Sequence, residues 1–170
     1  MFTSSFKNSL WIIRYHILSY IIVIVLWHFW LSKYPNLWVV ILAATFLIIE
    51  VGYLGIVAIA IHIQYLNFER NRKIEISGDK MIISRKGCIT NSISINEIDK
   101  IIKLDSIVNK GNIFPSLMDS YYYLVIYTSK LQPIIITCLM GIGIDKKIAE
   151  WSGCKIEHKR IFFPFIKKNL

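Results

Sequence analysis

The pattern of apolar and polar positions divides the chain into two parts. Between residues 10 and 66 almost every position is apolar, and only three residues carry a formal charge. Beyond that stretch, apolar and polar residues alternate in short runs separated by Gly, Pro, Asn and Asp, which is typical of β-strands joined by turns. The pattern predicts an apolar helical unit in residues 1–68 and a strand-rich unit in residues 69–170.

Two apolar runs make up the first part. Residues 10–31 and 37–66 each reach the roughly 20 residues that a helix needs to cross a bilayer. The segment SKYPN between them contains a proline and predicts a turn. Lys and Arg residues flank both outer ends, whereas the turn contains only Lys33. By the positive-inside rule we predict a transmembrane helical hairpin in a multi-pass inner-membrane protein, with both termini in the cytoplasm.

Glu50 is the single acidic residue of the apolar part. It lies about 20 Å along the second predicted helix from the turn, so folding the hairpin places it opposite the region of His16 and Tyr20. A carboxyl group in lipid is either protonated or hydrogen-bonded to a neighbour. We therefore expect an interhelical contact of Glu50 with His16 and Tyr20. The alternative is a proton or ion pathway through Glu50.

Short alternating segments follow the hairpin. KIEIS and KMIISRKG flank the dipeptide GD, which predicts a β-hairpin. A strand, an acidic corner and another strand are predicted in ITNSISINEIDKIIKL. Two more strands are predicted in SYYYLVIYTS and QPIIITCLMG. Finally, GIDKKIAEWSG carries apolar residues at helical spacing, and Gly153 is placed to end that helix.

The order of these elements and three of the segments resemble bacterial membrane-anchored PH-domain-containing proteins. The segments are IEISGDKMIISRKG, ISINEIDKI and YYLVIYTSKLQPIIITCLM, and the resemblance covers roughly residues 72–153 and the general layout of the preceding hairpin. It implies an α+β fold: a pleckstrin-homology-like antiparallel β-barrel or sandwich with a C-terminal helix, beside the membrane hairpin. The first hairpin loop, SGDKM, contains Lys80 and Asp79 and lacks the dense basic cluster of lipid-binding members. Headgroup recognition is therefore not implied.

A basic surplus lies in the strand-rich part. The chain carries a formal net charge of +9, and the residues from 68 onward contribute +7 of it. Because these charges are scattered on a chain that is predicted to be anchored, nucleic acid is not an expected partner. The tail KIEHKRIFFPFIKKN mixes aromatic and basic residues, which suits an anionic lipid surface. The expected membrane-surface residues are Lys159, Arg160, Phe162, Phe163, Phe165, Lys167 and Lys168. The alternative is that this tail forms a last strand or an arm packed on the barrel.

No catalytic motif accompanies these segments. The sequence contains no HExxH, no GxSxG and no complete phosphate-binding glycine loop, and its four histidines are dispersed. The three cysteines, at positions 88, 138 and 154, form no CxxC pair, which predicts reduced thiols instead of a zinc site or a disulfide framework. We expect no catalytic residue, no cofactor and no metal.

From the sequence, we expect a non-enzymatic binding or scaffold module that is held in the inner membrane. This module is expected to engage a protein partner or the anionic membrane surface. The expected partners are the bilayer and a protein of unknown identity, and the hairpin offers a surface for a homo-oligomer. The alternative function is a subunit of a membrane enzyme or transport complex that uses the intramembrane Glu50.

Overall fold

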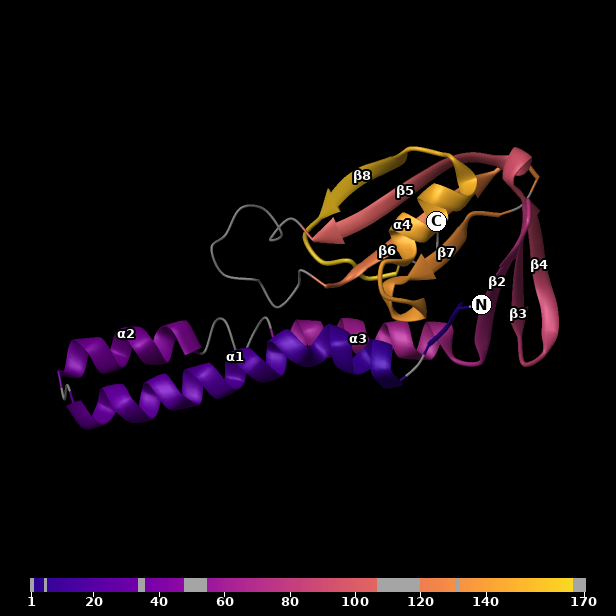
Figure 1. Ribbon diagram of the computed structural model, residues 1–170. Coiled ribbons are helices and arrows are strands. Elements are labelled where there is room, and N and C mark those ends of the chain that lie inside the picture. Colours follow the sequence, from indigo (N-terminus) through magenta and orange to yellow (C-terminus); the bar gives the residue numbers. More distant parts are fainter. Residues whose placement is uncertain are drawn as a thin grey trace.

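Two four-stranded sheets and the helices packed on them form the computed structural model of the chain (Figure 1). The structure describes residues 2–4, 6–33, 36–47, 55–106, 120–130 and 132–166. Within these residues the elements are β1 (Phe2–Thr3), α1 (Phe6–Lys33), α2 (Leu37–Leu47), α3 (Gly55–Glu69), β2 (Arg72–Ser77), β3 (Lys80–Arg85), β4 (Cys88–Ser94), the 3₁₀ turn η2 (Ile95–Glu97), β5 (Ile98–Ser106), β6 (Tyr122–Thr128), β7 (Ile134–Thr137), the 3₁₀ turn η4 (Cys138–Met140), α4 (Ile144–Ser152) and β8 (Ile156–Ile161).

The local predictions for the strand-rich part are confirmed. Strands β2 and β3 form an antiparallel hairpin in which Ser77 pairs with Lys80 around the predicted GD turn. Gly78 in that turn has a φ of 58°, a conformation that glycine adopts without steric cost. The acidic corner is η2, where the Glu97 carboxylate accepts a hydrogen bond from the Ser94 N–H at 3.0 Å. Helix α4 ends as predicted at Gly153, which has a φ of 64°.

The second sheet, with strand order β7-β6-β5-β8, is buried on both faces near its centre. Along β6, Tyr123 and Val125 belong to one core cluster, whereas Leu124 and Ile126 belong to the other. Because successive side chains of a strand point to opposite faces, this alternation means that each face packs against protein. Two-sided burial explains why the strand reads as the continuous apolar run YYLVIYT instead of an alternating one.

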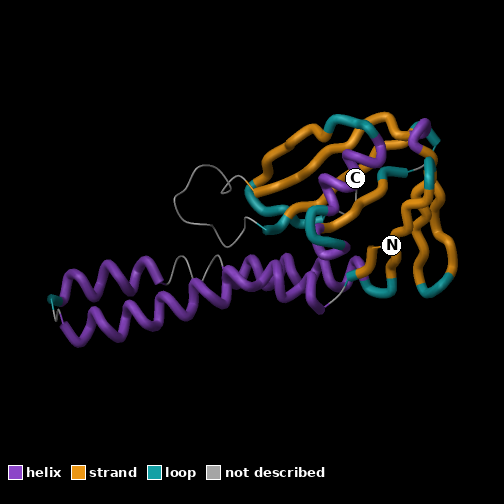
Figure 2. The backbone as a smooth tube through the Cα atoms, in the orientation of Figure 1, coloured by secondary structure: helices purple, strands orange, loops and turns teal. Residues whose placement is uncertain are grey.

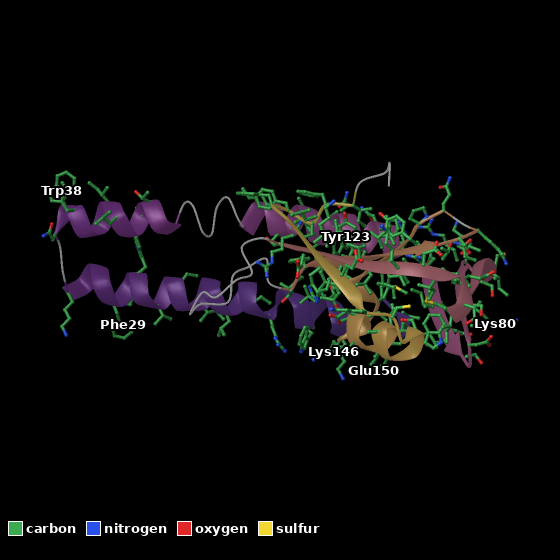
Figure 3. The ribbon with its side chains drawn as sticks, turned by 90° about the horizontal axis from the view of Figure 1, so that it is seen from above. Phe29, Trp38, Lys80, Tyr123, Lys146 and Glu150 are labelled. Carbon is green, nitrogen blue, oxygen red and sulfur yellow. The ribbon has the colours of Figure 1, made fainter. Side chains whose placement is uncertain are left out.

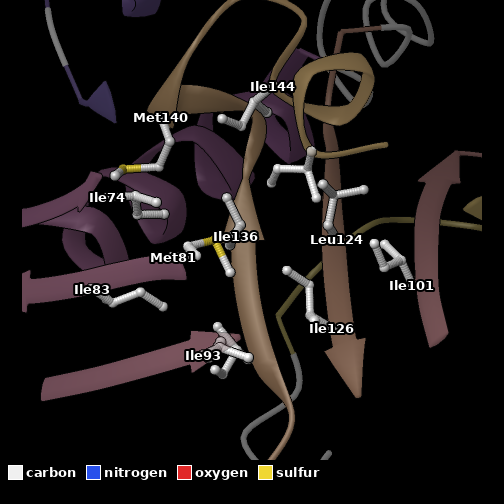
Figure 4. Close-up of a cluster of buried hydrophobic side chains, with 12 residues drawn as sticks. Ile74, Met81, Ile83, Ile93, Ile101, Leu124, Ile126, Ile136, Met140 and Ile144 are labelled. Carbon is white, nitrogen blue, oxygen red and sulfur yellow. The ribbon is translucent and has the colours of Figure 1, made fainter. Parts of the chain in front are cut away.

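One core cluster lies between the two sheets and beneath α4 (Figure 4). The first sheet supplies Ile74, Met81, Ile83 and Ile93, and these side chains meet residues of β5, β6 and β7 from the second sheet. Helix α4 closes this cluster with its apolar side, which includes Ile144 and Ile148. The other core cluster fills the opposite face of the second sheet, where α1 and α3 run along the strands (Figure 2).

The arrangement of the strands corrects the predicted PH-like barrel with a C-terminal helix. The strands form two separate sheets in a small α+β fold, and α4 is followed by a further strand, β8. Strand β8 pairs in parallel with β5, so the second sheet is not purely antiparallel. The physical reason is the corner η2, which turns the chain after β4 so that β5 joins β6 and β8 instead of β4. The alternation of apolar and polar residues specified which segments form strands, but it did not specify which strands pair with each other.

The helical hairpin is present, but its predicted role is wrong. Helices α1 and α2 lie antiparallel and project beyond the sheets (Figure 1). Within the described residues, no helix has both the length and the apolar character that crossing a membrane requires. This finding overturns the predicted transmembrane hairpin, and the multi-pass inner-membrane localisation with cytoplasmic termini that was inferred from it.

Part of the apolar runs packs within the chain. In the second run the described helical residues form α2 (Leu37–Leu47) and α3 (Gly55–Glu69). Helix α3 places Ala58, Ile61 and Tyr65 in the protein core, so its apolar side is required there. Helix α1 also begins on this core, where Ile12 is buried. One side of α3 therefore packs within the chain, while Ile56, Ile59, Ile63 and Leu66 on its other positions are exposed.

A buried ion pair joins the end of α3 to both sheets. The carboxylate of Glu69, which is fully buried, accepts hydrogen bonds from Arg72 Nη1 at 3.1 Å and from the Thr137 N–H at 2.9 Å. Arg72 Nη1 also donates to the Ile135 carbonyl at 2.6 Å. Burial raises the pKa of the Glu69 carboxyl, while Arg72 and the Thr137 N–H act in the opposite direction. The contacts connect α3, β2 and β7 at one point.

Replacing Glu69 with Ala should destabilise the fold strongly. The change leaves the Arg72 guanidinium buried without its counter-charge and the Thr137 N–H without a partner, which is expected to cost about 3–5 kcal/mol. The measurement is the free energy of unfolding in urea, followed by circular dichroism. The matched control is Glu75→Ala, on the exposed side of β2, which should change the value by less than about 0.5 kcal/mol. Equal effects of the two substitutions would contradict a structural role for the pair.

Candidate anion-binding cleft

Two turns of unusual backbone conformation meet where α3 passes into β2. Asn71 and Lys86 have φ values of 60° and 52°, and Asn71 O accepts a hydrogen bond from the Lys86 N–H at 2.9 Å. Non-glycine residues seldom adopt positive φ, and for Lys the conformation costs on the order of 1 kcal/mol. The register of the hairpin, in which Arg72 pairs with Arg85, brings the two turns together. Such strained residues concentrate at functional sites.

Two adjoining hollows flank these turns, and together we call them the basic cleft. The first has a volume of about 620 Å³ and is lined by Asn67, Arg70, Asn71, Arg85, Lys86 and Thr90. The second, of about 530 Å³, is lined by Thr3, Ser4, Leu66, Asn67, Arg70, Asn71, Arg72 and Lys73. Asn67, Arg70 and Asn71 belong to both, so the last turn of α3 and the residues after it form the wall between the hollows.

The charges of the cleft are of one sign. Its lining contains Arg, Lys, Asn, Ser and Thr side chains and one leucine, and no carboxylate. Arg72 is neutralised by Glu69, and Arg85 Nη2 donates to the Phe68 carbonyl at 2.9 Å, where it caps the negative end of α3. Arg70, Lys73 and Lys86 form no ion pair with any described carboxylate. These three side chains are exposed, and their charges are available to a ligand.

The chemistry of this lining favours an oxyanion. Guanidinium and ammonium groups are donors only, and the amide and hydroxyl groups of Asn and Thr add further donors at the same place. Phosphate offers several acceptor oxygens, and Arg binds phosphate with two parallel hydrogen bonds. The cleft contains no described His, Cys, Asp or Glu, and nowhere in the described residues do three such side chains come together as a metal site requires.

The predicted interhelical contact lies largely outside the described residues. Glu50 is not among them, and His16 and Tyr20 lie on α1 without described side chains. The contact of Glu50 with His16 and Tyr20 therefore stays a prediction.

The tail residues are distributed between a strand and a packed segment. Lys159 and Arg160 lie exposed on β8, and Phe162 is also exposed. Phe163 packs against the core cluster beneath α3, and Phe165 is 36% exposed. Lys167 and Lys168 lie outside the described residues. Contact of this tail with a membrane surface stays a prediction.

Hydrogen bonds hold the end of the tail against α3. The Pro164 carbonyl accepts a hydrogen bond from the Tyr65 hydroxyl at 2.7 Å, and Gln64 bonds to both the N–H and the carbonyl of Ile166, at 2.9 Å and 3.2 Å. Residues 164–166 after β8 therefore pack on α3.

The cleft is not predicted from the patterns along the chain, although the sequence contains a signal for it. Arg70 and Arg72 lie some 15 residues before Arg85 and Lys86, and the positive-inside rule treats them only as a charge flank of the apolar run. The antiparallel register of β2 and β3 was itself predictable from the GD turn. That register places the first residue of one strand beside the last of the other, which would have brought the two basic pairs together.

A second polar cluster joins α1 to α3. The Ser9 hydroxyl lies 2.7 Å from Nε2 of His62, and the Tyr121 hydroxyl lies 3.1 Å from Nδ1. A Ser–His pair is also the start of a nucleophilic triad, but here the third group is a tyrosine instead of a carboxylate, and neither hollow of the cleft includes these residues. With both ring nitrogens bonded and the ring buried, His62 connects the two helices.

Comparisons with known proteins return no relatives. No protein-family model matches the chain, and searches of curated proteins and of solved structures find no match either. The resemblance to membrane-anchored PH-domain-containing proteins accordingly stays an expectation drawn from the sequence.

The buried His62 predicts a loss of stability in mild acid. Burial lowers the pKa of His62 from its ordinary value of 6.5, so the unfolded chain binds a proton at this residue at a pH where the folded chain does not. The free energy of unfolding should therefore fall as the pH decreases below 6.5 towards the folded-state pKa. Urea unfolding at pH 7.5 and 5.5 measures this decrease.

Two histidine variants isolate the contribution of His62. His62→Gln should reduce the decrease in stability between the two pH values, whereas His28→Gln, at an exposed position on α1, should leave it unchanged. An unaltered decrease in His62→Gln would show that another group titrates.

Proposed function

We propose that this protein is a non-enzymatic binding module that holds a phosphate-bearing ligand in the basic cleft. The observation that carries the proposal is the composition of the cleft, in which hydrogen-bond donors and cations converge without a carboxylate. Arg85 and Arg72 are held by structural partners, so they form a fixed frame. Arg70, Lys73 and Lys86 have no such partner among the described residues, and of these Arg70, which lines both hollows, and Lys86 are the groups that engage the ligand most directly.

The size and position of the cleft favour a single phosphate group or a small headgroup. Each hollow measures about 500–600 Å³, within the range of small-molecule sites. A nucleic-acid duplex presents a charge about every 1.7 Å and is bound by an extended basic face. The cleft is instead confined to the junction of α3 with the first sheet, from Thr3 of β1 to Thr90 of β4. Binding without chemistry is consistent with a lining that supplies donors for an anion but no carboxylate or histidine to act as a general base.

Removing two of the unpaired charges should weaken phosphate binding. The double variant Arg70→Gln/Lys86→Gln is expected to bind pyrophosphate roughly 10-fold more weakly than the unmodified chain, because the two exposed charge-assisted contacts together contribute up to about 2 kcal/mol. Isothermal titration calorimetry at low ionic strength measures the affinity, and added salt should weaken it because exposed charges are screened beyond about 10 Å at 0.1 M. Neither side chain has a structural partner within the described part of the chain, so the urea midpoint should not change.

A matched variant separates the cleft from the general basic charge. Lys146→Gln/Lys155→Gln removes the same formal charge from exposed positions that do not line the cleft, and it should retain the affinity. Equal weakening in both double variants, or no measurable binding by the unmodified chain, would contradict the proposal.

The source of the phosphate is distinguished in a second titration. Vesicles of phosphatidylcholine with and without phosphatidic acid present the group on a lipid, whereas pyrophosphate and phosphoserine present it in solution. Binding to phosphatidic acid vesicles that depends on Arg70 and Lys86 and exceeds binding of the soluble compounds would indicate a lipid headgroup. The reverse order would indicate a soluble ligand.

A further inference from the structure

An exposed apolar stripe runs along one side of α3. We call it the α3 stripe; its four members follow one another at spacings of three and four residues, which places them on one side of a helix. They are Ile56, Ile59, Ile63 and Leu66, with exposed fractions of 68%, 56%, 53% and 40%. In Figure 3 the helix leads from the projecting hairpin, marked by Trp38, towards the sheets.

The stripe ends at the basic cleft. Leu66, its last member, lines the second hollow together with Arg70 and Lys73. Arg70 follows Leu66 by four residues and lines both hollows. The stripe and the cations of the cleft therefore belong to one continuous surface, which is apolar along the helix and positively charged where the helix ends.

A surface of this kind matches an amphiphile with an anionic head. The stripe extends from Ile56 to Leu66, about 15 Å of helix at 1.5 Å per residue. A hydrocarbon chain can lie along this length while a phosphate at one of its ends occupies the cleft. Burial of the chain removes apolar surface of the ligand and of the stripe from water, which is favourable in proportion to the area.

The placement of the charges favours a single lipid molecule over a bilayer surface. A helix that lies on an anionic bilayer is rich in Lys and Arg along its polar face. Helix α3 contains neither, and its single formal charge, Glu69, is buried. Between Lys33 and Arg70 the sequence contains no Lys or Arg at all. The cations that follow α3 are thus gathered at one end of the stripe, where one head group can meet them.

We propose that the ligand of the basic cleft is a phosphate ester with a hydrocarbon chain, bound as a single molecule. Its phosphate contacts Arg70 and Lys86, and its chain lies along the α3 stripe from Leu66 towards Ile56. This assignment rests on the phosphate binding proposed above, because it adds a second contact to the ligand that the cleft holds.

Affinity should therefore increase with the length of the chain. The probes are butyl phosphate and octyl phosphate, both below the concentration at which they form micelles, and pyrophosphate is the chain-free reference. A fully buried methylene strengthens binding about fourfold, and a half-buried one about twofold. The four additional methylenes of octyl phosphate should strengthen binding to the unmodified chain by roughly 10- to 20-fold, measured by isothermal titration calorimetry.

A polar substitution on the stripe should remove this gain. Ile59→Gln/Ile63→Gln is expected to bind butyl and octyl phosphate equally and to retain its affinity for pyrophosphate. Both side chains lie outside the core clusters, and Gln is a good helix former, so the circular dichroism spectrum and the urea midpoint should be retained. The control Ile89→Gln/Ile142→Gln, at exposed apolar positions that do not line the cleft, should keep the gain.

The probes separate a failure of this inference from a failure of the phosphate site. Equal affinities of the unmodified chain for butyl and octyl phosphate would overturn the inference, and so would a gain that persists in Ile59→Gln/Ile63→Gln, while pyrophosphate binding would still support the cleft. Binding to phosphatidic acid vesicles without any gain for dispersed octyl phosphate would also overturn it, because a bilayer would then cover the stripe. No binding of pyrophosphate or of either ester would contradict the phosphate site itself.

Discussion

The burial of the second sheet on both faces is the constraint on which the rest of this structure depends. A strand such as β6, with Tyr123 and Val125 on one side and Leu124 and Ile126 on the other, is stable only if both sides are covered. The first sheet and α4 cover one side, and α1 and α3 cover the other. The apolar sequence of α3 follows from this requirement, because its residues 58, 61 and 65 are part of the core.

The basic cleft is a consequence of how α3 ends on that sheet. Glu69 and Arg72 anchor the end of the helix to β7, and the chain must then reverse through Asn71 to begin β2. The hairpin of β2 and β3 returns Arg85 to the same place, where it caps the Phe68 carbonyl. The groups that close the fold thus leave Arg70 and Lys86 in the lining of the same hollow with their charges exposed.

Helix α1 belongs to two environments along its length. Its first turns pack on the core through Ile12 and bond to η4 and α3 through Asn8 and Ser9. Beyond residue 17 its described apolar side chains are largely exposed, and α2 accompanies it there. One continuous helix therefore links the protein core to the projecting hairpin.

The sequence by itself determined the local elements. Alternation and the GD turn specified the hairpin of β2 and β3, Glu97 specified the corner after β4, and Gly153 specified the end of α4, because each depends on residues that are close together in the chain. Only the tertiary structure decided which strands share a sheet, since the parallel pairing of β5 with β8 joins segments some 55 residues apart. It also decided the role of the apolar run. A helix that is apolar on all sides is buried either in a membrane or in a protein core, and its own sequence does not distinguish the two. In α3 the second sheet makes that decision, because Tyr123 and Val125 of β6 require a cover that Ile61 and Tyr65 provide.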